Sequence, residues 1–150
     1  MSQLNSILDA VVTRVASLGL IKDSVVIPVV KRKLPRRQET MDSPTTITVS
    51  PPDAPDSVIY AAFGAQWWSY TVNITVVSPN DQDLASNIDT YTGWRDQIKA
   101  LFMPPFASPP LVGVPLVWDM RVKPQVLFHR SMLAMNYDYQ QIAVEFLSTA

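Results

Sequence analysis

The segment from Trp67 to Val77 restricts the fold of this chain more than any other part of the sequence. Its apolar side chains occupy every second position, and that period of two is typical of a β-strand with one face against a core. One face would carry Trp68, Tyr70, Val72, Ile74 and Val76, and the other Ser69, Thr71, Asn73 and Thr75. We therefore predict a strand that turns its hydroxyl-rich face toward water or another subunit.

Two helices are predicted, one before and one after this strand. Apolar residues recur at three- and four-residue spacings from Leu4 to Leu18, with Ser2 placed to cap the start and Gly19 to end the helix. The second helix follows the turn signal at residues 78–81 and stops at Met103-Pro104-Pro105. Its buried stripe is expected to consist of Leu84, Ile88, Tyr91, Ile98 and Phe102.

Several further strands are predicted from alternation or from β-branched runs. They cover Ser24–Val30, Thr46–Val49, Ser57–Phe63, Leu116–Val122, Val126–Arg130 and Tyr137–Leu147. The order of helix, several strands, helix, several strands predicts an α+β fold, a mostly antiparallel β-sheet with two helices packed on one face. A chain of 150 residues has the size of one domain, here residues 1–150.

A proline-rich stretch at about residues 31–56 departs from this regular pattern. It contains five of the 13 prolines, many hydroxyl side chains and much of the charge, and only residues 46–49 resemble a strand. We predict a long hairpin or loop excursion from the domain. Loops of this length are uncommon in compact domains, so we expect this one to be functional or ordered by partners.

The excursion begins with a basic cluster. Five of the 12 basic residues lie in it, although the chain as a whole has a net charge of −1: Lys31, Arg32, Lys33, Arg36 and Arg37. Clustered cations attract DNA without reading its sequence, because each neutralised phosphate releases counterions. For a monomer, a solvated loop or ion pairs to acids of a neighbour is the favoured interpretation, whereas in a ring every subunit would contribute the cluster and the summed field would grow.

The low charge content suggests that another chain covers part of the surface. Charged residues make up 17% of the chain, below the roughly 25% usual for a globular domain. Exposed tryptophans are favoured anchors of such interfaces. Trp67 points away from Trp68, and Trp94 lies off the main stripe of its helix, so we predict Trp67 and Trp94 as subunit contacts. Trp68 and Trp118 are predicted to be core residues.

Most catalytic and cofactor-binding arrangements find no support in the sequence. The chain has no cysteine, one histidine (His129) and four widely spaced glycines, which assemble neither a zinc site nor a phosphate-binding loop. We expect no enzyme, no metal and no cofactor. A small hydrolase built on His129 and an aspartate is the enzymatic alternative. No run approaches the roughly 18 apolar residues of a membrane span, so no membrane partner is expected.

The layout of the whole chain resembles the tail-terminator and tail-completion proteins of long-tailed bacteriophages. The features that carry the resemblance are the opening helix, the excursion, the strand followed at once by a helix, and the closing strand: Leu4–Leu18, Lys31–Pro55, Trp67–Val77, Asp81–Phe102 and Tyr137–Phe146. The resemblance concerns the order and size of these elements rather than signature residues.

The resemblance implies a structural virion protein of the tail or neck that is assembled in the host cytoplasm. Members form a ring, commonly a hexamer, that caps the tail tube and joins it to the head connector, with genomic DNA passing through the lumen. The implied partners are further copies of the chain, the tail tube protein, head–tail connector proteins and DNA. The basic cluster would then face the lumen or another subunit. The alternatives are a head-closure or adaptor protein, a tail-tube-like subunit, and a nonspecific DNA-binding module.

Overall fold

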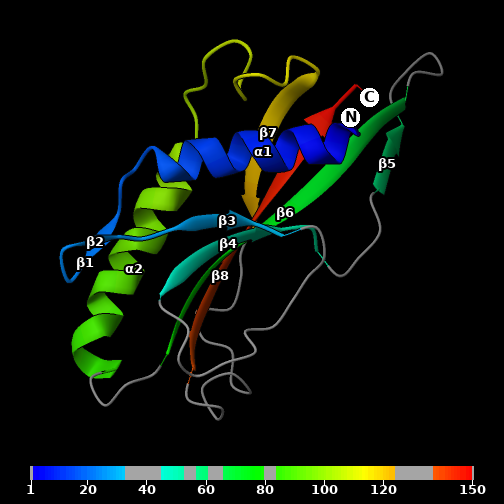
Figure 1. Cartoon of the computed structure of the whole chain (residues 1–150). Coiled ribbons are helices and arrows are strands. Elements are labelled where there is room, and N and C mark those ends of the chain that lie inside the picture. The colour runs from blue at the N-terminus through cyan, green and yellow to red at the C-terminus, as the bar shows by residue number, and fades with distance from the viewer. Residues whose placement is uncertain are drawn as a thin grey trace.

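Two helices lie against a mostly antiparallel sheet. The computed structural model describes residues 2–32, 45–52, 57–60, 66–79, 84–123 and 137–149. Within them, helices α1 (Gln3–Ala16) and α2 (Leu84–Leu101) contact a sheet made of β3 (Val29–Lys31), β4 (Thr46–Ser50), β5 (Ser57–Tyr60), β6 (Gln66–Pro79), β7 (Val117–Lys123) and β8 (Tyr137–Ser148) (Figure 1). The short strands β1 (Ile21–Lys22) and β2 (Val25–Val26) form a separate hairpin. The predicted α+β class is confirmed.

The strand order places β3 and β7 at opposite edges of the sheet. The order is β3-β4-β6-β8-β7, and β5 pairs additionally with one end of β6. All pairs are antiparallel except β3 with β4, which run parallel. The longest pairing joins β6 to β8, from Trp68 opposite Ser148 to Pro79 opposite Tyr137.

One face of the sheet forms the core together with both helices. The pairing of β6 with β8 sets Tyr70 opposite Phe146, Val72 opposite Val144 and Ile74 opposite Ile142. These side chains belong to one buried cluster that also includes Ile7, Leu8, Val11 and Val15 of α1 and Tyr91, Trp94, Ile98 and Phe102 of α2. A single cluster on one face of the sheet explains why both helices have an apolar stripe.

The predicted ends of the first helix are present. The Ser2 hydroxyl accepts a hydrogen bond from the Asn5 backbone N–H at 3.2 Å, as an N-cap residue does. The helix ends before Gly19, whose φ of +57° is a conformation that glycine adopts without steric cost. In α2, Tyr91, Ile98 and Phe102 are buried as predicted. The side chains of Leu84 and Ile88 lie outside the described residues.

The predicted single strand Ser24–Val30 is wrong. Asp23 and Ser24 both have positive φ values, 52° and 65°, and form the two-residue turn of the β1–β2 hairpin. Positive φ at both central residues is the requirement of a type I′ turn, whose twist matches that of the strands it joins. Pro28 then separates β2 from β3, since it lacks the N–H that a continuous strand would use.

Trp118 is not a core residue, contrary to the prediction. A register irregularity between Val117 and Asp119 shifts the alternation of β7 at this point, as a β-bulge does. Trp118 is consequently 40% exposed and packs against Trp67, with 4.8 Å between the ring centroids. Beyond the irregularity, Met120 is buried and Val122 packs against the core as predicted.

The hydroxyl-rich face of β6 is less open than predicted. Ser69 and Thr75 are buried within the chain itself, and only Thr71 and Asn73 are partly accessible. The Ser69 hydroxyl donates a hydrogen bond to Glu145 of the neighbouring strand β8. This face therefore satisfies part of its polar groups internally, rather than presenting all of them to water or to another subunit.

The predicted excursion at 31–56 contains β4, while residues 33–44 and 53–56 lie outside the described part of the chain. Because β3 and β4 run parallel, the connection between them joins opposite ends of the two strands, unlike the turn of a hairpin. The predicted strand Val126–Arg130 also lies outside the described residues. Residues 102–116 link α2 to β7 with cis peptide bonds before Pro105 and Pro109.

The turn of the β1–β2 hairpin gives a first prediction. A serine with a left-handed backbone conformation carries a steric cost that glycine avoids. We expect Ser24→Gly to raise the free energy of unfolding by about 0.5–1 kcal/mol, measured by urea denaturation. Ser17→Gly is the matched control, because Ser17 has an ordinary right-handed φ of −64°. A destabilised Ser24→Gly variant would contradict the assigned turn.

Candidate interaction surfaces

The described part of the basic cluster is attached to the first helix. Lys31 ends strand β3, and its Nζ donates to a carboxylate oxygen of Asp9 on α1 at 2.5 Å. Both side chains are partly exposed, so this ion pair contributes at most about 1 kcal/mol. The backbone N–H of Arg32 donates to the Val49 carbonyl, which extends the pairing of β3 with β4. Lys33, Arg36 and Arg37 lie outside the described residues.

The two tryptophans predicted as subunit contacts have different surroundings. Trp94 is 5% exposed and lies in the core beside Tyr91, with 5.3 Å between the ring centroids. Its indole is covered by its own chain, so the structure does not place it on the surface expected of an interface anchor. Trp67 is half-buried on the sheet face away from the helices, where it packs against Trp118. These two indoles form a partly accessible aromatic pair.

The β1–β2 hairpin has three apolar side chains that are exposed to solvent. Ile21 is 58% exposed, and Val25 and Val26 are each 62% exposed. Asp23 and Ser24 form the exposed tip between the strands. Ile21–Val26 is called the apolar hairpin below. A β-hairpin with valine and isoleucine on its outer side is a typical contact surface for another chain.

The apolar hairpin is fixed to the body of the protein at its base. Leu20 and Ile27 flank it, are both buried in the core, and are joined by a 2.8 Å backbone hydrogen bond from the Ile27 N–H to the Leu20 carbonyl. Lys22 points inward, and its Nζ donates to the Tyr91 hydroxyl of α2 at 2.6 Å. The hairpin is thus held in a fixed orientation, in which Lys22 and its cross-strand partner Val25 share the side toward α2, and Ile21 and its partner Val26 share the other side.

Tyr91 connects the hairpin to the sheet through a chain of hydroxyl groups. Its hydroxyl is 2.7 Å from the Ser78 hydroxyl of β6, which in turn is 2.9 Å from the hydroxyl of Thr45. The Lys22 ammonium also lies 5.1 Å from the centroid of the Tyr91 ring, within the range of a cation–π contact. Sequence periodicity predicted Tyr91 as buried, but it gave no sign of this polar role.

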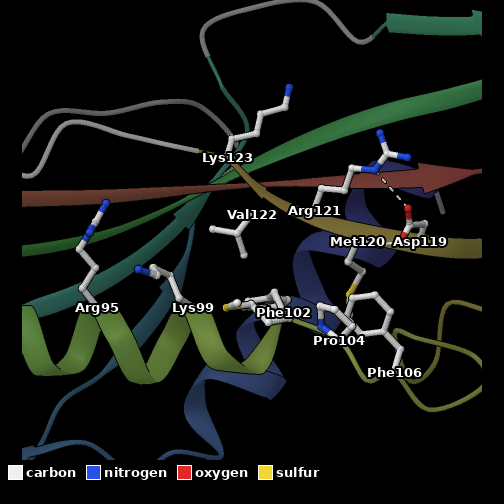
Figure 2. A pocket seen from close by; sticks show the side chains of 11 residues that line it. Arg95, Lys99, Phe102, Pro104, Phe106, Asp119, Met120, Arg121, Val122 and Lys123 are labelled. Carbon is white, nitrogen blue, oxygen red and sulfur yellow. Dashed lines mark hydrogen bonds and ion pairs between the residues drawn. The ribbon is translucent and has the colours of Figure 1, made fainter.

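A groove of about 760 Å³ lies between α2 and the edge strand β7 (Figure 2). One side is formed by Arg95 and Lys99 of α2 and by Phe102, the first residue after the helix. The residues that follow the helix and the outer strand complete it: Met103, Pro104, Phe106, Asp119, Met120, Arg121, Val122 and Lys123. This β7 groove has an apolar floor and a polar rim.

The rim of the β7 groove is mainly cationic. Arg95, Lys99, Arg121 and Lys123 line it together with the acidic residue Asp119, and the side chains of Arg121 and Lys123 extend away from α2 (Figure 2). Three of these cations make exposed ion pairs: Arg121 with Asp119 at 3.2 Å, Lys99 with Asp96 at 3.5 Å and Lys123 with Glu145 at 3.8 Å. Such pairs are weak and exchange readily with other acids. The groove therefore favours an occupant that combines apolar and acidic groups.

A second hollow, of about 530 Å³, lies between α1 and residues 111–113. Arg14 is held beside it, because its guanidinium donates to the Pro110 carbonyl at 2.7 Å and lies over the Phe102 ring. Val112, 79% exposed, stands at its rim. This hollow carries no comparable excess of one charge.

The described residues do not assemble a metal site or a membrane-spanning helix. In that part of the chain, no three histidine, cysteine, aspartate or glutamate side chains are grouped closely enough to bind a metal ion. Neither α1 nor α2 is long and apolar enough to cross a bilayer. His129, on which the hydrolase alternative depends, lies outside the described residues.

Comparison with known protein families and curated proteins finds no relative of this chain. The chain matches no model of a known protein family, and no curated protein is significantly similar to it. The fold and surfaces themselves define a small α+β domain with an exposed apolar hairpin that contacts α2 and a groove, lined by several cations, between α2 and β7.

The anchoring role of Tyr91 can be tested by removing a single oxygen atom. Tyr91→Phe keeps the ring but deprives the Lys22 ammonium and the Ser78 hydroxyl of a shared partner. We expect the free energy of unfolding to fall by about 1–3 kcal/mol in chemical denaturation, since one of the lost hydrogen bonds involves a charged donor. Unchanged stability of Tyr91→Phe would refute the anchoring role.

Proposed function

We propose that this protein is a ring-forming structural subunit of a bacteriophage tail, acting as a tail terminator that caps the tail tube and joins it to the head connector. The observation that carries the proposal is a pair of exposed surfaces of different chemistry, the apolar hairpin, which contacts α2 through Lys22 and Tyr91, and the β7 groove. A domain with such surfaces is suited to contact copies of itself.

The geometry of the two surfaces favours a ring over a simple dimer. A two-fold dimer uses the same patch on both subunits, whereas a contact between different patches repeats from one subunit to the next. Such a contact closes into a ring when a whole number of these rotations from subunit to subunit adds up to 360°. Contacts between two different patches, the apolar hairpin and the β7 groove, are compatible with this arrangement.

The resemblance in the order of elements supplies the rest of the proposal. It implies a ring, commonly a hexamer, whose partners are the tail tube protein, the head–tail connector proteins and the genomic DNA in the lumen. Lys31 and Arg32, together with Lys33, Arg36 and Arg37, would face that lumen or a neighbouring subunit. Repeated around a ring, the basic cluster would generate a summed positive field toward DNA.

Other neck and tail components share the same physical requirements. A head-closure protein, an adaptor or a tail-tube-like subunit would also need contacts between copies, so the surfaces alone do not separate them. Immunogold labelling of virions with an antibody against the chain would separate them, because a terminator lies only at the head-proximal end of the tube.

The ring predicts a definite solution behaviour. With rising protein concentration, native mass spectrometry and light scattering should pass from the 16.7 kDa monomer to one closed oligomer, without longer polymers. Rings should be visible by negative-stain electron microscopy, alone or at the ends of purified tail tubes. A chain that stays monomeric at every concentration and does not bind tail tubes would refute the proposed function.

A further inference from the structure

We propose that the apolar hairpin Ile21–Val26 of one subunit inserts into the β7 groove of the next, so that the two sheets are joined edge to edge. The inference rests on the proposed ring and specifies the contact that would build it. The occupant of the groove is a second copy of this chain, and the contact is head-to-tail.

The hairpin has the chemistry of the occupant that the groove favours. Ile21 and Val26, which are cross-strand partners on the side of the hairpin away from Lys22, match the apolar floor formed by Phe102, Met120 and Val122. Lys22 is turned toward Tyr91, which leaves Asp23 as the charged group at the exposed tip. A single acid among apolar side chains therefore meets a rim on which cations outnumber acids.

The backbones of the two elements are complementary as well. Among the described residues, β7 pairs on one side only, with β8, and the hairpin strands pair only with each other. An edge strand accepts an additional strand through backbone hydrogen bonds, while pockets select the side chains of the incoming strand. The groove volume lies within the roughly 300–1,000 Å³ of well-formed binding pockets, which suits a few side chains rather than a large partner surface.

The apolar floor also argues against nucleic acid as the occupant. A DNA backbone presents phosphates and sugars, and phosphate contacts are made by cations and other polar donors. Phe102, Met103 and Phe106 would then contribute nothing to binding. A protein segment uses both parts of the groove, the floor through its aliphatic side chains and the rim through its carboxylate.

Cysteine cross-linking tests the contact directly, because the natural chain has no cysteine. Val25 on the hairpin and Met103 on the rim of the groove are 62% and 52% exposed, so both substitutions should be tolerated. Treatment of the assembled Val25→Cys/Met103→Cys variant with a short bis-maleimide should give a covalent ladder that ends at the ring size. Each single-cysteine variant should stay uncross-linked, since a head-to-tail contact keeps like residues apart.

Val25→Cys/Val112→Cys is the control, because Val112 is more exposed than Met103, at 79%, but does not line the groove. Efficient cross-linking of this control, or dimers from Val25→Cys alone, would overturn the proposed contact. Intact rings that leave Val25→Cys/Met103→Cys uncross-linked would overturn it too, while the proposed function would stand. Absence of rings in the unmodified protein would instead remove the proposed function and this contact together.

A charge exchange tests the electrostatic part of the same contact. Asp23→Lys and Lys99→Glu should each raise the concentration needed for half-assembly roughly two- to fivefold, and the double variant should recover most of that loss. Val26→Glu should raise this concentration at least roughly tenfold, because it brings a carboxylate onto the apolar floor. Val112→Glu should leave assembly unchanged.

Two outcomes of the charge exchange would contradict the contact. Additive losses in the double variant would show that Asp23 and Lys99 do not meet. If Lys99→Glu weakened binding to a DNA duplex and left ring formation unchanged, the groove would belong to nucleic acid instead.

Discussion

The antiparallel pairing of β6 with β8 is the interaction on which the rest of this structure depends. It aligns Tyr70, Val72 and Ile74 with Phe146, Val144 and Ile142, and so places all six side chains on the helix side of the sheet. A slip of one residue would turn one strand's apolar set to the opposite face, so the alternation itself specifies the register. Strands β4 and β7 then add to the outer sides of this pair, and both helices cover its apolar face.

This central pair also determines which parts of the chain become sheet edges. With β6 and β8 in the middle, β3 and β7 are left at the two sides. The apolar hairpin leads into β3 and is fixed by Leu20, Ile27 and the bond from Lys22 to Tyr91. The groove forms at the other side because α2 follows β6 and packs near β8, which brings Arg95 and Lys99 alongside β7. Both proposed contact surfaces are thus consequences of the same strand order.

The sequence predicted those features whose cause is local periodicity or a local cap. Alternation identified β6 and β8, and three- and four-residue spacings identified both helices. The wrong predictions lie where the backbone departs from regular strand geometry. The positive φ values of Asp23 and Ser24 divide a predicted strand in two. The register irregularity next to Trp118 turns that indole outward. From the sequence, Trp94 is predicted to lie outside the buried stripe of its helix. Trp94 nevertheless lies three residues after Tyr91 and four before Ile98, and it is buried with them. Local sequence patterns could not predict the β7 groove. It forms between α2 and β7, and the position of β7 depends on its pairing with β8.

The cations of β7 would have a second role in the proposed ring. An exposed edge strand risks pairing with the same edge of another copy, and lysine and arginine side chains discourage this by mutual repulsion. Arg121 and Lys123 would oppose each other in such a symmetric contact, whereas an incoming hairpin that carries Asp23 meets attraction instead. One set of charges therefore disfavours the two-fold dimer and favours the head-to-tail contact, which is how an interface gains specificity through repulsion as well as attraction. In the proposed ring, that discrimination would matter more than a tighter contact, because assembly would have to stop at a closed oligomer.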